Sequence, residues 1–475
     1  MKLAVLVSGS LLLAGCSVGP KYRPPDTPAP PAFSEQPPQS FQEAGWKQAQ
    51  PADAQLRPDW WQVFGDPDLN GMEAQVDPAN QSLKAAEARF RQARALIQLN
   101  RSGLYPTVST APSITTNRVS QHAPLGTHIG DYGQYLLPVD LNYEVDLWGR
   151  IRRSVTAARE EAQATAADLE TLRLSVHAEL AIDYFELRSR DAQTQLLYQA
   201  IEAYQKALEL TQHRFDGGLS SRAEVAQART QLETTRAQAV GVDVDRATFE
   251  HAIAVLSGRP PEGFHLSVRP LSGTPPPVPV GVPGQLLERR PDVASAERLV
   301  AEANERVGIA RAAFFPTLLI TAEGGFEGNK VVNWLVWPSR FWSLGPSAAQ
   351  ILFDAGRRRA ASTAAGAGYD ETVAQYRQTA LTAFQEVEDA LSTLRILEQQ
   401  TRAQHVAVDA ARQSLELSMS RYKGGLVTYL EVVTAQTTAL QNESTEVDLL
   451  RRRMIATVLL IKALGGGWDI SRLPS

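Results

Sequence analysis

The chain carries one hexamer pattern twice, and each copy interrupts a long helical pattern. Residues 214–219 read Arg-Phe-Asp-Gly-Gly-Leu, and residues 421–426, 207 positions later (421 − 214), read Arg-Tyr-Lys-Gly-Gly-Leu. The same spacing relates four further pairs: Gly149 and Gly356, Leu187 and Leu394, Glu224 and Glu431, and Gly258 and Gly465. Upstream, 105–107 and 315–317 match at a spacing of 210 (315 − 105). The sequence therefore predicts an internal duplication.

Paired glycines in both hexamers predict sharp helix reversals, because glycine readily adopts the left-handed conformation that ends a helix. Before the first reversal the helical pattern covers 149–215, which is about 100 Å at the usual rise. The return helix, 220–256, and a separate helix, 79–104, would be about 55 Å and about 38 Å long. The second copy repeats this plan over 356–422, 428–464 and 292–315. In each copy the two short helices, stacked end to end, nearly match the length of the long helix. This arrangement predicts the wall of a tube with uniform height.

Composition narrows the class of protein. The net charge of −5 at pH 7 argues against nucleic acid as a partner, and the aromatic content of 7% is low for a large enzyme core. The seven histidines are scattered, and the sequence has no phosphate-binding glycine loop followed by Gly-Lys-Ser or Gly-Lys-Thr. We therefore expect no enzyme activity, no metal site and no cofactor.

The clearest strand pattern covers 134–146, where apolar and polar residues alternate. The apolar face carries Tyr135, Leu137, Val139, Leu141, Tyr143 and Val145. A strand of this length, with a polar second face and tyrosines at both ends of its apolar face, is typical of a membrane β-barrel. Weaker alternation predicts partner strands over 107–117, 317–327 and 341–353, the last with a bulge before Ile351.

Two loops would join these strands. Residues 118–131 would form an external loop, and the segment between 327 and 341 carries an apolar cluster of Val331, Val332, Trp334, Leu335, Val336 and Trp337. This cluster either rests against lipid or forms a short packed helix.

Four strands cannot close a barrel, and an open membrane sheet would leave unpaired backbone groups in hydrocarbon, each at a cost of several kcal/mol. Several copies of the chain must then share one barrel, with eight strands from two chains or twelve from three.

The N-terminus indicates secretion. Lys2 and the apolar run over 3–13 have the form of a signal peptide, and the run is too short for a transmembrane helix. The sequence Leu-Ala-Gly-Cys over 13–16 resembles the bacterial lipoprotein processing signal, which implies cleavage before Cys16 and lipid attachment to that residue. By the same resemblance Ser17 favours sorting to the outer membrane. The alternative is an ordinary signal peptide with a chance cysteine. Cys16 is the single cysteine of the chain, so no internal disulfide can form.

Changes in composition divide the chain. The predicted order is a signal peptide over 1–15, a lipidated N-terminal tether and equatorial segment over 16–75, a first repeat over 76–258, a linker and equatorial region over 259–290, a second repeat over 291–465 and a C-terminal tail over 466–475. The proline-rich tether would be extended, with little core of its own, and Trp60, Trp61 and Phe64 would dock it onto the body.

Several motifs are similar to the outer membrane factor family of tripartite efflux systems (TolC-like), in particular to NodT-type outer membrane efflux lipoproteins. The matching motifs are Leu-Ala-Gly-Cys at 13–16, Val-Asp-Leu-Trp-Gly-Arg at 145–150, Arg-Pro-Asp-Val at 290–293, Phe-Pro-Thr at 315–317, Leu-Phe-Asp-Ala-Gly-Arg at 352–357 and Ala-Leu-Gly-Gly-Gly-Trp at 463–468. This resemblance implies an α+β membrane protein: a homotrimer in which four strands per protomer build a shared transmembrane β-barrel that continues into a periplasmic α-barrel. It also implies a periplasmic adaptor protein docked on the helix tips and an inner-membrane pump that supplies energy.

The resemblance carries functional roles onto particular residues. The helix reversals would contact the adaptor through Gly217, Gly218, Leu219, Gly424, Gly425 and Leu426. The family closes its periplasmic tip with carboxylates just after the second reversal, where this chain has Thr434 in place of the usual Asp. Glu431, one turn earlier, remains acidic, so we expect a periplasmic gate of Glu431, Thr434 and Tyr422, with Tyr422 and Tyr429 packed across the closed tip. The alternative role for Glu431 is a solvated helix carboxylate.

Three functions fit these features. The first is a passive outer-membrane duct that exports drugs or other small toxic compounds. The second is the outer-membrane duct of a type I protein secretion system. The third is a lipid-anchored periplasmic coiled-coil scaffold without a pore.

Overall fold

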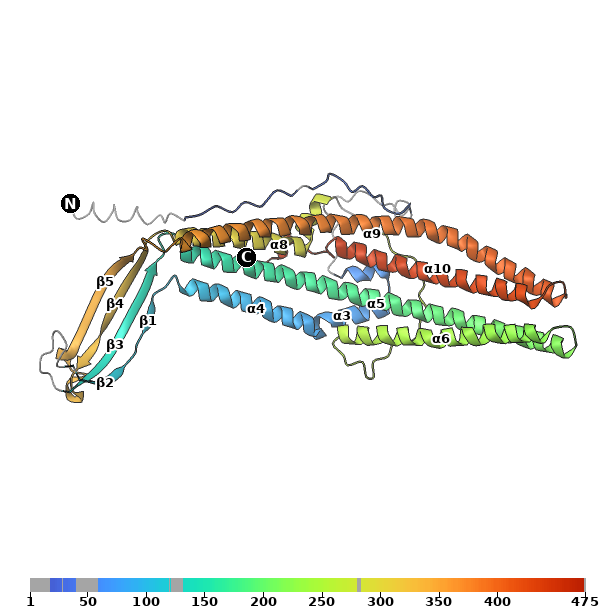
Figure 1. The fold of residues 1–475 in the computed structure, drawn as a ribbon, viewed down its shortest axis with the longest axis horizontal. Helices are drawn as coiled ribbons and strands as arrows, with labels where there is room; N and C mark the ends of the chain where they lie inside the picture. Colours follow the sequence, from blue (N-terminus) through green and yellow to red (C-terminus); the bar gives the residue numbers. More distant parts are fainter. Residues whose placement is uncertain are drawn as a thin grey trace.

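A β-sheet at one end and a bundle of long helices along the rest of the chain form one elongated body (Figure 1). The computed structural model describes residues 18–27, 29–39, 59–118, 120, 131–279 and 283–473. The predicted signal peptide, Cys16 and most of the predicted 118–131 loop therefore lie outside the described residues.

The helices of the body come in two sets of matching length. The first set is α4 (Gln81–Ser102), α5 (Arg150–Asp216) and α6 (Arg222–Leu256), and the second is α8 (Pro291–Ala312), α9 (Arg357–Lys423) and α10 (Tyr429–Ala463). α5 and α9 have 67 residues each, α6 and α10 have 35 each, and α4 and α8 have 22 each. This equality confirms the predicted pairing of two short helices with one long helix in each repeat. None of the helices in the described ranges combines enough length and apolarity to cross a bilayer.

Shorter helical segments complete the described chain: η1 (Trp60–Phe64), α3 (Pro67–Ala79), η2 (Pro283–Gln285), α7 (Leu286–Arg289), η3 (Val331–Asn333), η4 (Trp337–Ser339) and η5 (Ile470–Arg472).

Both helix reversals have the same backbone geometry. In each pair only the second glycine has a positive φ, 72° at Gly218 and 75° at Gly425, whereas Gly217 and Gly424 have negative values. The amide of the following leucine closes each turn by donating to a carbonyl five residues earlier, at 2.7 Å in the first copy and 2.9 Å in the second. This bond is the mark of a helix C-terminus with a left-handed cap. The left-handed requirement therefore falls on Gly218 and Gly425 alone.

The break between α3 and α4 corrects one predicted boundary. We expected a helix over 79–104, but residue 79 ends α3, and Pro78 lies inside that helix. The new helix begins after Asn80, whose side-chain oxygen accepts from the Leu83 amide at 3.1 Å while its Nδ2 donates to the Leu256 carbonyl at 2.9 Å. The cap that starts α4 thus also ties it to the end of α6.

The sheet has the order β1-β3-β4-β5, with β2 also paired to β3, and all these pairs are antiparallel. Its strands are β1 (Thr107–Ser109), β2 (Ser113–Asn117), β3 (Tyr132–Val145), β4 (Thr317–Gly328) and β5 (Arg340–Ala349). The predicted strand 107–117 is thus broken at residues 110–112, which include Pro112. The predicted bulge in the last strand is wrong, because the β4–β5 register is continuous and β5 ends at Ala349, before the apparent change of phase.

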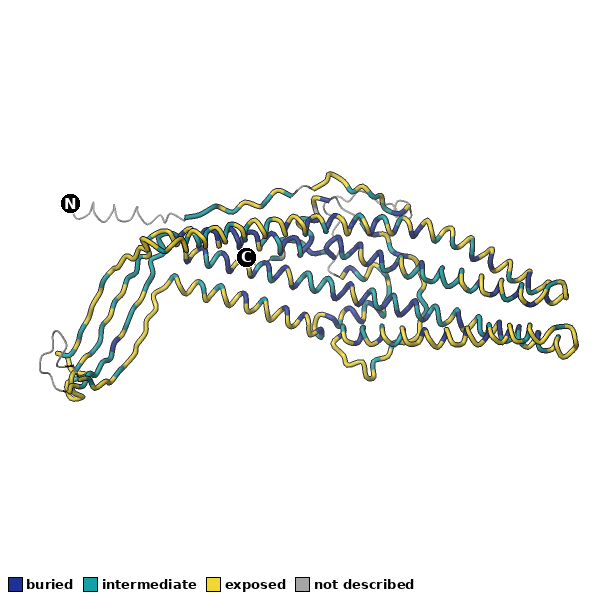
Figure 2. The backbone as a smooth tube through the Cα atoms, viewed as in Figure 1, coloured by how far each residue is buried: buried dark blue, intermediate teal, exposed yellow. Residues whose placement is uncertain are grey.

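The hydrophobic core lies along the middle of the helix bundle, where Figure 2 shows the most buried residues. α5 contacts α4, α6, α8 and α10, and α9 contacts α8 and α10. One apolar cluster joins Tyr184 and Leu187 of α5 to Val387 and Leu391 of α9 and to Ile461 of α10. The half of the bundle next to the sheet contains α4, α5, α8 and α9 (Figure 1). The half that ends in the two reversals, which we call the helix tips, contains α5, α6, α9 and α10.

The segment 18–39 has more contacts than we expected of a tether. It lies along α8 and α9 in an extended path (Figure 1) and makes specific contacts along its length. The Tyr22 hydroxyl donates to the Glu297 carboxylate, and the amides of Ser34 and Glu35 donate to the Glu388 carboxylate at 2.7 and 2.8 Å. The prediction of little core was therefore incomplete: this segment, which we call the N-terminal strap, is docked on the helices.

Candidate channel surfaces

The sheet has one apolar and one polar face. Cross-strand partners lie on the same face of a sheet, so the register sorts the side chains. The predicted apolar face of β3 continues across β4 and β5 through Leu318, Ile320, Ala322, Phe326, Leu344 and Trp342. On this face Val139 is 50% exposed, Leu344 67% and Trp342 77%, so nothing in the described chain covers it. Apolar side chains in such numbers on an uncovered face indicate contact with lipid.

The opposite face carries carboxylates. Asp140 and Glu323 are direct cross-strand partners, Glu327 lies opposite Leu136, and Glu144 lies opposite Leu319. Arg150 neutralises one of them, since its guanidinium lies 2.7 Å from Glu144 at the end of the sheet nearest the helices. The polar face therefore carries carboxylates along its length, with the Asp140–Glu323 pair at the middle of the sheet. We call Asp140, Glu144, Glu323 and Glu327 the acidic band.

Both edges of the sheet are open within one chain. The edge formed by β1 and β2 and the edge formed by β5 have a strand on one side only in the described residues. Unpaired strand edges are templates for pairing with another chain.

The two helix tips share a small core. Tyr422 and Tyr429 are 1% and 0% exposed, and their ring centroids lie 5.3 Å apart. The Tyr422 hydroxyl lies 3.3 Å from Thr211 Oγ1 on α5, and the Arg214 guanidinium covers its ring at 4.8 Å. The Glu224 carboxylate accepts from the Tyr429 amide at 3.1 Å, which ties the first tip to the second. The two tyrosines thus pack on each other within a single chain, and their packing across a closed tip stays a prediction.

The other predicted tip residues lie at the surface. Leu219 and Leu426 are 72% and 75% exposed at the ends of the two reversals. The Glu431 carboxylate lies 2.8 Å from the Arg421 guanidinium, and the Thr434 hydroxyl donates to the Leu430 carbonyl at 2.9 Å. Glu431 is therefore a paired, solvated carboxylate, whereas Tyr422 lies in the tip core with its ring away from solvent.

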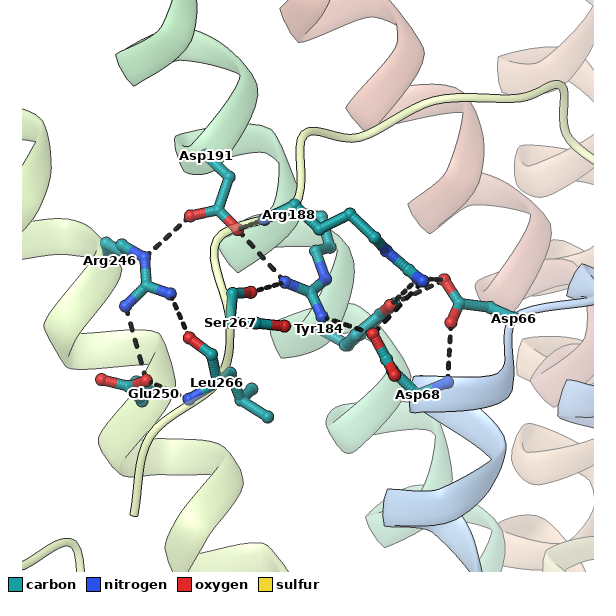
Figure 3. Close-up of polar contacts among 10 residues, drawn as sticks. Asp66, Asp68, Tyr184, Arg188, Asp191, Arg246, Glu250, Leu266 and Ser267 are labelled. Atoms are coloured by element: carbon teal, nitrogen blue, oxygen red, sulfur yellow. Dashed lines mark hydrogen bonds and ion pairs between the residues drawn. The ribbon is translucent and has the colours of Figure 1, made fainter. Parts of the chain in front are cut away.

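At mid-length a network of charged residues joins α3, α5, α6 and the linker (Figure 3). Arg188, 2% exposed, donates to the Ser267 carbonyl at 2.6 Å and lies 3.1 Å from Asp68 and 3.2 Å from Asp191. Asp191 also binds Arg246 at 2.7 Å. The sequence contained a signal for this network, because Arg188 recurs as Arg395 at the same spacing as Leu187 and Leu394, but the sequence did not indicate the partners of Arg188.

A buried histidine lies on the other side of α3. His177 Nδ1 is 2.6 Å from the Glu73 carboxylate, its Nε2 is 3.6 Å from Asp77, and Trp61 stacks on its ring at 4.5 Å. Burial raises the pKa of Glu73 to about 7. Burial also opposes a charge on His177, but its hydrogen bonds with Asp77 and Glu73 outweigh that effect and raise its pKa to about 9.

This cluster predicts a pH dependence of stability. A group whose pKa is raised on folding stabilises the fold below its unfolded pKa, and that stabilisation is lost as the pH rises through its folded pKa. For His177 the window runs from 6.5 to about 9. His177→Gln combined with Glu73→Gln, which also removes the buried carboxyl that titrates in the same range, should remove a loss of about 1–3 kcal/mol across this window. Denaturant unfolding of both proteins between these pH values measures the difference, and parallel stability curves would contradict the assignment.

Comparison with known proteins decides the family. A family model described as outer membrane efflux protein matches residues 75–259 and 282–466, two segments that begin 207 residues apart (282 − 75). The chain belongs to the outer membrane efflux protein family. It is 31% identical over 466 residues to the toluene efflux pump outer membrane protein TtgF of Pseudomonas putida, covering 97% of this chain and 96% of the relative. It is 29% identical over 478 residues to the pyoverdine export outer membrane protein OpmQ of Pseudomonas aeruginosa, covering 99% and 98%.

Solved structures of outer-membrane channels have the same fold as this chain. The outer-membrane channel OprN superposes with a TM-score of 0.88 at 30% identity, covering 95% of this chain and 100% of that one. The Campylobacter jejuni CmeC channel superposes with a TM-score of 0.89 at 24% identity, covering 96% of each chain, and supports the fold alone. These findings confirm the predicted efflux family, the α+β channel fold and the outer-membrane location.

Proposed function

We propose that three copies of this chain form a passive duct, without a catalytic step or cofactor of its own, in a tripartite efflux pump. The observation that supports this proposal most strongly is the sheet, which has one apolar face suited to lipid, one polar face and two open edges. In hydrocarbon such edges must be paired, so β5 of one copy joins the β1–β2 edge of the next. Three copies then give twelve strands, counting β1 and β2 as one, and twelve helices at each level of the bundle.

We keep the predicted domain boundaries, and the start of the N-terminal strap suggests where the lipid anchor lies. The Val18 amide donates to the Trp148 carbonyl at 3.1 Å, and the buried Arg153 guanidinium donates to the Val18 carbonyl at 2.8 Å. Trp148 follows β3 by three residues, so the strap begins at the helical end of the sheet. Cys16 precedes Val18 by two residues in the sequence. A lipid on Cys16 would enter the inner leaflet beside the barrel.

The helix tips are the proposed contact with the periplasmic adaptor. Gly217, Gly218, Leu219, Gly424, Gly425 and Leu426 form the ends of the body farthest from the sheet (Figure 1). The periplasmic gate is assigned to Glu431 and Thr434, with Tyr422 in a supporting role as the core of the tip. Release of Glu431 from Arg421 would leave like charges facing each other in three copies.

The tip assignment can be tested by substitution. Leu219→Glu combined with Leu426→Glu should lower export at least about tenfold, because two exposed apolar anchors become charged. Val268→Glu, at a 68% exposed position of the linker away from the tip, is the matched control and should keep export. The measurement is survival on a pumped compound in cells that supply adaptor and pump. Normal survival of the double variant, present in the outer membrane at the normal level, would contradict the assignment.

The acidic band should make the duct prefer cations. Asp140→Asn with Glu323→Gln removes one cross-strand carboxylate pair per chain, so the reversal potential in a salt gradient should move toward zero. Glu262→Gln on the exposed linker is the control. An unchanged reversal potential in the double variant would show that these side chains do not line the ion path.

The transported class is proposed from the names of the relatives. Toluene, other solvents, antibiotics and pyoverdine are named for several of them, and these are small molecules rather than proteins. Export of small toxic compounds with a cognate adaptor and pump tests this directly. Secretion of a protein in place of such compounds would favour the type I secretion alternative, and a purified protein without any conductance in planar bilayers would favour the scaffold.

A further inference from the structure

The turn between β4 and β5 presents apolar side chains at the end of the sheet farthest from the helices (Figure 1). Val331, Val332, Leu335 and Trp337 are 67%, 76%, 61% and 72% exposed. The backbone of the turn is ordered by η3, by η4 and by a hydrogen bond from the Ser339 hydroxyl to the Asn333 carbonyl at 2.5 Å. This order holds the apolar side chains on the outside of the turn. The predicted short helix is present as η3 and η4, but it is exposed rather than packed, and contact with lipid stays a prediction.

The turn folds toward the apolar face of the sheet. Gly328 is the cross-strand partner of Tyr135, so both lie on that face. A Cβ on Gly328 would lie 2.9 Å from the Trp334 Cα and 3.0 Å from the Asn333 carbonyl oxygen, so the backbone of the turn covers this side. The Trp334 ring packs on the Tyr135 ring with centroids 5.7 Å apart. The polar face at this end is therefore not the side on which the turn rests.

A cation accompanies the apolar cluster on the same face. Arg340 is the cross-strand partner of Phe326, and its guanidinium lies 4.2 Å from the centroid of the Trp337 ring. Within the part of the chain that the structure describes, no carboxylate lies within ion-pair distance of Arg340, and the nearby Lys330 is exposed. Tryptophan and arginine together at the end of an apolar face are typical of the boundary between acyl chains and headgroups.

We infer that the β4–β5 turn, residues 329–340, is a lipid-docking element. Its apolar side chains enter the acyl boundary of the outer leaflet, and Arg340 and Lys330 bind the phosphates of lipid headgroups. The inference rests on the proposed barrel, because it takes the apolar face as the lipid face. Lipid is the occupant that fits, since the docking surface continues the exposed apolar face of β5 and adds cations where anionic headgroups lie.

Depth-dependent quenching of tryptophan emission tests the inference. The full-length protein and Trp337→Phe are reconstituted into vesicles of phosphatidylcholine and phosphatidylglycerol brominated either near the headgroup or near the bilayer centre. The difference between the two proteins isolates Trp337. Bromine near the headgroup should remove most of the Trp337 emission and central bromine much less. Trp342→Phe reports in the same way on the apolar face of β5, and Trp61→Phe reports on the distant mid-length region.

The outcomes separate the two claims. If Trp342 is quenched by brominated lipid but Trp337 is quenched only by a water-soluble agent, the docking inference fails and the barrel stands. If neither is quenched, the lipid face itself is wrong. Arg340→Gln tests the phosphate contact, because the dependence of Trp337 quenching on phosphatidylglycerol should weaken in this variant, which keeps only Lys330. If that dependence persists at the wild-type level, Arg340 does not bind the headgroup.

Discussion

Asp191→Ala should lower the free energy of unfolding by about 3–5 kcal/mol, because it leaves buried cations without their shared anion. Asp191 is 1% exposed and accepts hydrogen bonds from Arg188, from Arg246 and from the Arg269 amide (Figure 3). These bonds fix the linker onto α5 and α6, together with the bond from the Leu266 amide to Glu250 at 2.6 Å. Loss of the carboxylate should therefore also loosen the linker.

Denaturant unfolding measures this effect, and limited proteolysis within 259–279 reports on the linker. Glu233→Ala is the matched control. Its ion pair with Arg236 has side chains 57% and 46% exposed, and exposed pairs contribute about 0–1 kcal/mol. Equal stability of the two variants, with equal resistance of the linker to protease, would show that the mid-length network does not hold the linker.

Gly325→Ala should prevent assembly of the membrane sheet. A Cβ at this position would lie 2.0 Å from the Leu137 carbonyl oxygen and 3.0 Å from the Pro138 Cα, both backbone atoms of β3. Since backbone cannot rotate away as a flexible side chain can, the β3–β4 pairing must separate locally. Every barrel of three copies would contain three such defects, in an environment where unpaired backbone groups are costly.

The neighbouring strand provides the control for this substitution. Gly345 of β5 lies on the same polar face, and a Cβ there would meet no atom within 4 Å. Gly345→Ala should therefore reach the outer membrane at the wild-type level, whereas Gly325→Ala should be lost from the outer-membrane fraction. Normal amounts and normal conductance of the Gly325 variant would contradict the β3–β4 register.

The sequence predicted the parts of the fold that depend on local pattern. Strict alternation located β3 to within two residues, and the repeat spacing predicted both reversals and the equal helix lengths. These features are readable because the face of a strand and the end of a helix are set by neighbouring residues.

The features of the fold that the sequence did not predict depend on contacts between residues that are distant in the chain. Composition showed that the N-terminal strap is extended, but its position depends on acceptors such as Glu388 and Glu297, more than 270 residues away (388 − 34 and 297 − 22). The predicted helix start at residue 79 was wrong, because the cap is Asn80, which is fixed by its bond to Leu256. At the tip, contacts with α5 bury Tyr422 within one chain, and no local pattern of α9 indicates those contacts.

The most direct test of the shared duct is an electron-microscopy image of the purified, lipid-reconstituted particle together with its mass. We expect a mass of three chains and a hollow cylinder with threefold symmetry, continuous from the membrane to the helix tips. A single chain, a solid bundle, or a particle whose sheet lies outside the lipid would contradict the account.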